Sequence, residues 1–128
     1  MELNADDLLR DLIDEADAQR LRLDNPYVLD LIAVLLPHGV HGLSRGQVIR
    51  EVWKRRGKQG VNMPDAFDQT VQASFQQYAG EYAAFRKRNA AESDDLFFAP
   101  RGLGAGWWAV RVERATAWLA AKKKELRT

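Results

Sequence analysis

The stretch from Asp94 to Arg111 constrains the fold of this chain more than any other part of the sequence. It reads D-D-L-F-F-A-P-R-G-L-G-A-G-W-W-A-V-R, which is two short apolar runs joined by a glycine-rich loop. Aromatic and β-branched residues favour extended strands, and glycines allow the positive φ values that a tight connection requires. We therefore expect a β-hairpin here. Because the rest of the chain has helical patterning, this hairpin has to pack on helices.

Apolar residues at intervals of three and four predict helices in the other segments. The clearest series is aromatic, beginning at Phe67 and ending at Phe85. Its helix is expected either to continue to about Arg88 or to break near Gly80, because glycine is a poor helix former. The predicted helices span residues 4–23, 26–36, 44–56, 64–88 and 113–126.

The helix expected at 26–36 is apolar nearly all round, so we expect it at the centre of the core. Ser44 and Gln47 have the form of a capping box at the start of the next helix, and Leu43 before them is expected to be extended. Residues 57–63 are predicted to form the turn that follows, since two glycines interrupt the pattern there.

Length and composition are those of a single globular domain of 128 residues, with 46% hydrophobic and 29% charged residues. Cysteine is absent, which excludes disulfides, thiolate zinc sites and a cysteine nucleophile. No apolar run is long enough to cross a membrane, and the first residues lack the pattern of a secretory signal. We therefore expect a cytoplasmic protein without a membrane partner.

Charge is divided unevenly along the chain, although the net charge is only +1. Residues 1–30 hold nine acids and three bases, whereas the remaining residues hold sixteen bases and nine acids. An acidic first helix followed by a basic body suggests a surface for a polyanion on one side of the molecule. Alternatively, the two parts neutralise each other across the fold.

The order of these elements is helix, helix, helix-turn-helix, hairpin and helix. Over residues 27–111 the chain resembles the winged-helix DNA-binding domain at the N-termini of some restriction-type endonucleases and in related chromatin proteins. Three features carry the resemblance: Gly42-Leu43-Ser44 followed by Val48 and Ile49, the aromatic helix from Phe67 to Phe85, and Asp95-Leu96-Phe97 ahead of G-A-G-W-W-A-V-R at residues 104–111.

The resemblance implies a mainly α fold with a small β-hairpin, namely a winged helix-turn-helix with an extra helix at each end. We expect one domain over residues 1–128. It would consist of an acidic N-terminal helix at 1–24, a winged-helix core at 25–112 and a C-terminal helix at 113–128.

A run of cations lies at the helix-turn-helix and suggests contacts with phosphates. The first helix of such a motif crosses the nucleic-acid backbone, so cations near its end are well placed to bind it. The helix macrodipole also favours cations at a helix C-terminus, and this explains two or three of them. The six residues are Arg45, Arg50, Lys54, Arg55, Arg56 and Lys58.

The face of the fourth helix opposite its aromatic residues carries Gln69, Gln72 and Gln76. Glutamine can pair with adenine through two hydrogen bonds in the major groove, so these are candidates for contacts with bases. Asp65 and Asp68 on the same helix would repel phosphates. Because they lie in the first turn, we interpret them as partners of the helix dipole.

Further cations are expected to extend this surface. Arg101 lies in the hairpin loop beside proline and glycines, where it could reach the minor groove or a phosphate. Arg86 and Lys87 form a second basic run. The adjacent residues Trp107 and Trp108 should point to opposite faces of a strand, and core packing is expected for both.

Residues for catalysis or for binding a cofactor are scarce. His38 and His41 are the only histidines and have no neighbouring carboxylate, so we expect no metal site and no cofactor. The predicted function is therefore non-catalytic binding of double-stranded DNA, as a transcriptional regulator or restriction-associated factor. The alternative is a protein-interaction adaptor on a winged-helix scaffold, dimeric or bound to a protein partner through the first and last helices.

Overall fold

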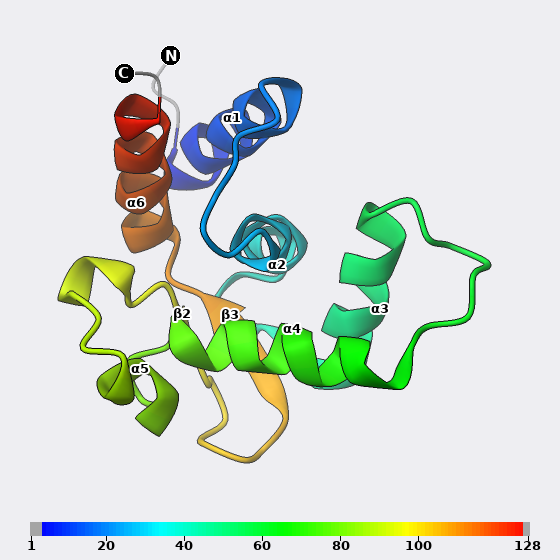
Figure 1. The fold of residues 1–128 in the computed structure, drawn as a ribbon. Helices are drawn as coiled ribbons and strands as arrows, with labels where there is room; N and C mark the ends of the chain where they lie inside the picture. Colours follow the sequence, from blue (N-terminus) through cyan, green and yellow to red (C-terminus); the bar gives the residue numbers. More distant parts are fainter. Residues whose placement is uncertain (1–3, 127–128) are drawn as a thin grey trace.

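The computed structural model describes residues 4–126, so residues 1–3 and 127–128 of the two predicted terminal segments lie outside the described residues. The structure is mainly helical with a small three-stranded antiparallel sheet (Figure 1), which confirms the predicted fold class at that level. In chain order the elements are α1 (Ala5–Ala18), α2 (Tyr27–Leu35), η1 (Leu36–His41), β1 (Leu43–Ser44), α3 (Arg45–Arg55), α4 (Asp65–Gln77), α5 (Ala83–Lys87), η2 (Glu92–Asp94), β2 (Phe97–Phe98), β3 (Trp107–Val110) and α6 (Val112–Glu125).

The predicted hairpin is present, and it gains a third strand from β1. Strands β2 and β3 pair with Phe97 opposite Val110, and β1 pairs with the other edge of β3 with Leu43 opposite Trp108. The strand order is therefore β1-β3-β2. Gly42 allows the approach of β1, because its φ is 75° and a Cβ atom there would collide with the carbonyl oxygen of Trp108.

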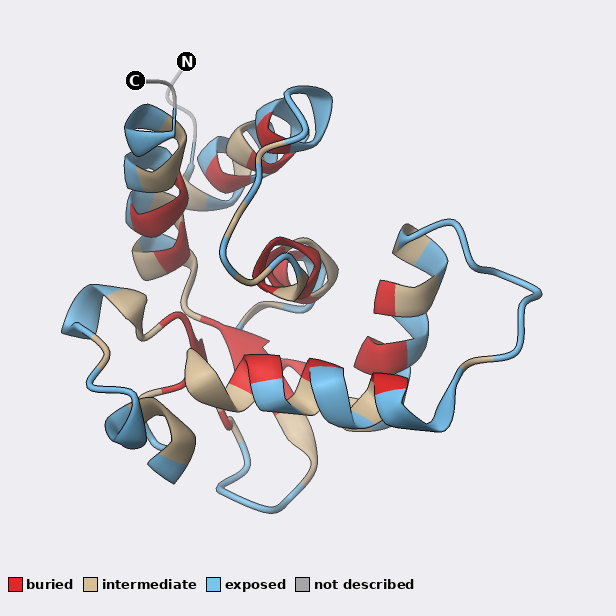
Figure 2. Cartoon of the chain, viewed as in Figure 1, coloured by how far each residue is buried: buried red, intermediate tan, exposed pale blue. Residues whose placement is uncertain are grey.

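The core lies around α2, as its all-round apolar pattern predicts. Six of the nine residues of α2 are buried, and Figure 2 shows this helix in the middle of the molecule. The core side of the sheet packs on α4 through aromatic rings. Phe75 stacks on Trp108 with 4.3 Å between ring centroids and on Phe97 with 5.4 Å. Helices α1 and α6 pack against each other beside this core (Figure 1).

The aromatic helix breaks near Gly80, as one of the two expectations held. Helix α4 ends at Gln77, and the backbone N–H of Gly80 donates to Asp95 Oδ1 at 2.7 Å. The N–H groups of Leu96 and Phe97 both donate to the carbonyl oxygen of Tyr78. The end of the helix thus binds the chain that enters β2, and α5 forms separately.

Helix α1 ends at Ala18, five residues before the predicted end. Arg20 has a φ of 50°, and the N–H of Leu21 donates back to Ala16, which closes the helix. Leu21 and Leu23 nevertheless pack against the core from the connecting segment. Their apolar character therefore extended the helical pattern beyond the helix.

The start of α3 is where the capping box predicts it, but the predicted hydrogen bonds are wrong. The hydroxyl of Ser44 donates to Gln47 Oε1 at 2.7 Å and makes no cap bond to the backbone. The backbone N–H of Arg45 donates instead to the carbonyl oxygen of Gly106 at 2.8 Å. The strand pairing of β1 thus leaves the first turn of α3 bound to the hairpin.

Candidate nucleic-acid interface

The outer face of α4 carries the three predicted glutamines. Gln69, Gln72 and Gln76 follow intervals of three and four, so they share one side of the helix. The opposite side is buried through Phe67 and Phe75. Figure 2 shows the outer side of α4 largely exposed, with no other element packed over it.

Arg45 joins this face to the hairpin. Its backbone contacts Gly106, as described above, and its side chain extends from α3 to α4. There its Nε donates to Gln72 Oε1, and its Nη2 lies 3.1 Å from Asp68 Oδ2. Asp68, expected to serve the helix dipole, therefore also holds an arginine. Three segments that are distant in the sequence therefore meet at Arg45, the hairpin at its backbone and α4 at its side chain.

The hairpin loop, residues 99–106, presents Arg101 beside the sheet. Its guanidinium lies 3.5 Å from the centroid of the Trp107 ring. A stack of this kind restrains an otherwise flexible side chain while leaving its N–H groups free to donate. Leu103 of the same loop is 57% exposed, and it was not among the predicted surface residues. Its position between Gly102 and Gly104 was the feature of the sequence that could have indicated an exposed apolar side chain.

Trp107 corrects one expectation about the tryptophans. Trp108 is 3% exposed in the core, as predicted. Trp107 points to the other face of the sheet, where it is only partly buried. Its partner there is Arg101, so the expectation of core packing for both rings is wrong for Trp107.

Arg55 and Arg56 are bound to carboxylates of the same molecule. Arg56 Nη2 donates to Asp30 Oδ2 at 2.7 Å, and its guanidinium lies 4.2 Å from the Tyr27 ring centroid. Arg55 donates to Asp17 at 2.8 Å and lies 3.1 Å from Asp30 Oδ1. Arg55 therefore connects α3 to both α1 and α2, whereas Arg56, the residue after α3, binds α2 alone. A lone acid within the apolar pattern of α2 was the sequence signal for this contact.

Burial raises the pKa of Asp30 above its ordinary value of 3.8, against the opposing attraction of Arg56 and Arg55. Asp30 is only 8% exposed. A carboxylate in such a place needs its cationic partners, because an unpaired buried charge is costly. This arrangement holds α2 and the end of α3 together and occupies both guanidinium groups with internal carboxylates.

The other predicted cations lie on two separate parts of the surface. Arg50, Lys54 and Lys58 are exposed along α3 and after it, and Lys54 makes an ion pair of 3.5 Å with Glu51. Arg86 and Lys87 belong to α5. Figure 1 shows α3 at the N-terminal end of α4 and α5 beyond its C-terminal end, so these two groups do not form one cluster.

Over residues 4–126, no group of three histidine or acidic side chains is close enough to hold a metal ion, and no helix is long and apolar enough to span a membrane. Comparison of the chain with family models, curated proteins and solved structures finds no match.

Proposed function

We propose that this protein binds double-stranded DNA without catalysis, through a winged helix-turn-helix. The order β1, α3, α4, β2, β3 with the sheet arranged β1-β3-β2 supports this assignment, because two helices precede a hairpin in it, as they do in a winged helix-turn-helix. Helix α4 would be the recognition helix and residues 99–106 the wing. Helices α1 and α6 are additions at the two ends.

The observation that carries the proposal is the uncovered face of α4 beside the wing. An α-helix fits the major groove of B-form DNA, and glutamine can bind an adenine edge through two hydrogen bonds. Gln69 and Gln76 are the side chains available for this, since Gln72 is bound to Arg45. Arg45 in turn attaches α3 to α4 and to the wing, so the three parts of the surface have a defined relative position.

The proposed phosphate contacts are Arg50, Lys54, Lys58 and Arg101. We leave Arg55 and Arg56 out because Asp30 and Asp17 already bind them. Each phosphate contact releases counterions, so four of them correspond to a slope of about −3.6 in log K against log salt concentration. Non-specific binding should therefore be weak and strongly dependent on salt.

The experiment is a salt titration of binding to a labelled duplex, measured by fluorescence anisotropy. Arg101→Ala with Lys58→Ala should weaken binding to any sequence and reduce the magnitude of the salt slope by about 2, which is about 0.9 per lost contact. The matched control is Lys87→Ala with Lys124→Ala, two exposed cations outside the surface. Absence of binding at low salt, or an unchanged slope in the first variant, contradicts the proposal.

A protein-interaction module on the same scaffold is the second candidate. The observation that favours it is that Arg45, Arg55 and Arg56 already have carboxylate partners, which reduces the charge available to a polyanion. This candidate predicts no binding of duplex DNA at low salt and stable capture of a protein partner. The DNA assay therefore separates DNA binding from a protein-interaction module. If DNA binds, we propose transcriptional regulation or a restriction-associated role as its function.

A further inference from the structure

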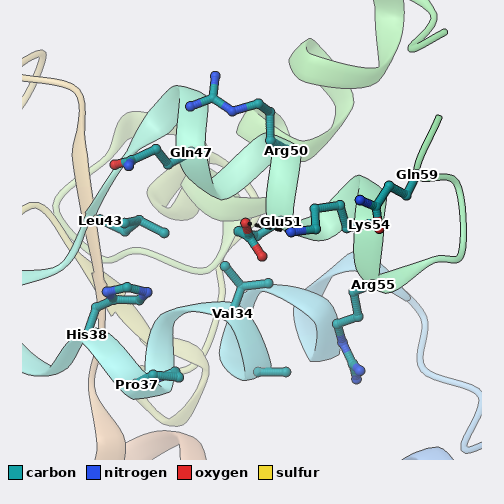
Figure 3. Close-up of a pocket in the computed structure, with 11 residues that line it drawn as sticks. Val34, Pro37, His38, Leu43, Gln47, Arg50, Glu51, Lys54, Arg55 and Gln59 are labelled. Carbon is teal, nitrogen blue, oxygen red and sulfur yellow. Dashed lines mark ion pairs between the residues drawn. The ribbon is translucent and has the colours of Figure 1, made fainter. Parts of the chain in front are cut away.

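A groove of about 690 Å³ runs between α2 and α3 (Figure 3). Its floor includes apolar side chains, with Val34 and Pro37 from the α2 side and Leu43 from β1, and the polar His38 and Gln47 also line the groove. Figure 3 shows Val34 pointing from α2 toward Glu51 of α3. A floor of this kind, open to solvent, fits an aliphatic side chain from another segment.

The rim of the groove is predominantly cationic. Arg50, Lys54 and Arg55 line it, against the single carboxylate of Glu51. Arg50 is exposed and makes no ion pair within residues 4–126. The pair of Lys54 with Glu51 is about half exposed on both sides, and such a surface pair contributes at most about 1 kcal/mol, so Lys54 can exchange partners.

Helix α1 has the complementary surface. It carries six carboxylates and one arginine, and Figure 2 shows its outer side exposed. Asp11 and Asp14 are exposed and make no ion pair within the described part of the chain. Leu8, which lies one turn before Asp11 on the same side, is 45% exposed. An apolar side chain next to unpaired carboxylates matches an apolar floor with a cationic rim.

We propose that α1 of a second copy of this chain docks in the α2–α3 groove. Leu8 would lie on Val34 and Pro37, and Asp11 and Asp14 would pair with Arg50 and Lys54. The same type of contact already occurs within one molecule, where Asp17 of α1 binds the groove residue Arg55 at 2.8 Å. The two surfaces differ, so the contact is head-to-tail and allows further copies to add.

Sedimentation velocity without nucleic acid tests this, so that its outcome is independent of DNA binding. The wild-type protein should self-associate in a concentration-dependent way at about 0.1 M salt and dissociate at about 1 M, where the Debye length falls from about 10 Å to about 3 Å. Asp11→Lys with Asp14→Lys should weaken association at least about tenfold, and so should Arg50→Glu with Lys54→Glu. Circular dichroism verifies that each variant is folded.

A mixture of the two charge-reversed proteins is the decisive sample. Each alone has like charges on both surfaces, whereas the mixture restores opposite charges and should recover association to near the wild-type level. The control, Lys87→Glu with Lys124→Glu, changes the net charge by the same amount as Arg50→Glu with Lys54→Glu, touches neither surface and should associate as the wild type does. A wild-type protein that is monomeric at every concentration, or a mixture that stays monomeric, overturns the proposal.

Discussion

Asp30 illustrates at the scale of one residue how this chain uses its charges. Its carboxylate is buried among the apolar side chains of α2 and is held by Arg56 and Arg55 from α3. Sequence position alone placed both arginines in a basic run beside a turn, where contacts with phosphates were expected. The buried acid explains why they point inward, because desolvation of Asp30 is offset only when its partners are present.

Truncation of one partner should therefore destabilise the fold. We predict that Arg56→Ala lowers the free energy of unfolding by about 1–3 kcal/mol, because it leaves part of a buried carboxylate unpaired and removes the contact with Tyr27. Lys58→Ala, at an exposed position two residues away, should change it by less than about 0.5 kcal/mol. Urea denaturation measures both. Equal small effects would show that the Asp30 contact contributes nothing.

Asp30 also predicts a dependence of stability on pH. Its pKa is raised in the folded protein above the ordinary pKa of 3.8. At a pH between these two pKa values, the folded state therefore binds this proton more tightly than the unfolded state does. Stability from this group is fully present below 3.8 and is lost as pH rises through the folded pKa. The unfolding free energy of the wild type minus that of Asp30→Asn should fall over this window. A difference that rises with pH contradicts the assignment.

At the scale of elements, the two adjacent tryptophans of β3 lie on opposite faces of the sheet and have different roles. Trp108 stacks on Phe75 in the core, whereas Trp107 supports Arg101 on the outer face. Period-two alternation of side chains along β3 produces this division. The core ring stabilises the joint between the sheet and α4, and the outer ring positions a loop cation.

The two rings should therefore differ in mutational cost. Trp108→Ala is expected to cost about 3–5 kcal/mol of unfolding free energy, as large core truncations do. Trp107→Ala should cost much less, and it should weaken DNA binding because Arg101 loses its restraint. Thermal denaturation and the anisotropy assay measure the two effects. Similar losses of stability in both variants would contradict the different burial of the rings.

The break between α4 and α5 gives a second prediction at this scale. A Cβ atom at Gly80 would lie 2.6 Å from Asp95 Oδ2, so Gly80→Ala should destabilise the protein by about 1–3 kcal/mol. Gly46 is a helical glycine in α3, and its added Cβ would lie 3.6 Å from Arg50. Gly46→Ala should instead stabilise by about 0.5–1 kcal/mol. Chemical denaturation measures the unfolding free energy of both variants. A stabilising effect of Gly80→Ala would contradict the close contact between Gly80 and Asp95.

Periodicity predicted the type and order of most elements, because apolar spacing determines which face of a helix or strand is buried. It did not place their ends, since these depend on distant partners. Helix α4 ends where Asp95 and the start of β2 bind its last turn. The pairing of β1 with β3 could likewise not be read from two residues. Of the candidate site, the glutamine face and Arg101 were predictable, whereas the ion pairs of Arg45 and Arg56 were not.

At the scale of the whole molecule, the split between an acidic beginning and a basic body has two consequences. Part of it is neutralised internally, through Asp17 and Asp30 with α3 and through Glu15 with Lys123 of α6. The remainder leaves exposed cations along α3 and in the wing, with exposed carboxylates on α1. Internal neutralisation thus accounts for part of the charge pattern, and a surface for a polyanion stays a prediction that rests on the exposed cations.

The most direct test of the central claim is an NMR titration of the isotope-labelled protein with a short duplex at low salt. Backbone amide shifts should change along the outer face of α4, between Gln69 and Gln76, and in the wing at residues 101–106. Amides of α6 should stay unchanged. Changes confined to α1 and α6, or no changes at all, would contradict the proposed DNA-binding surface.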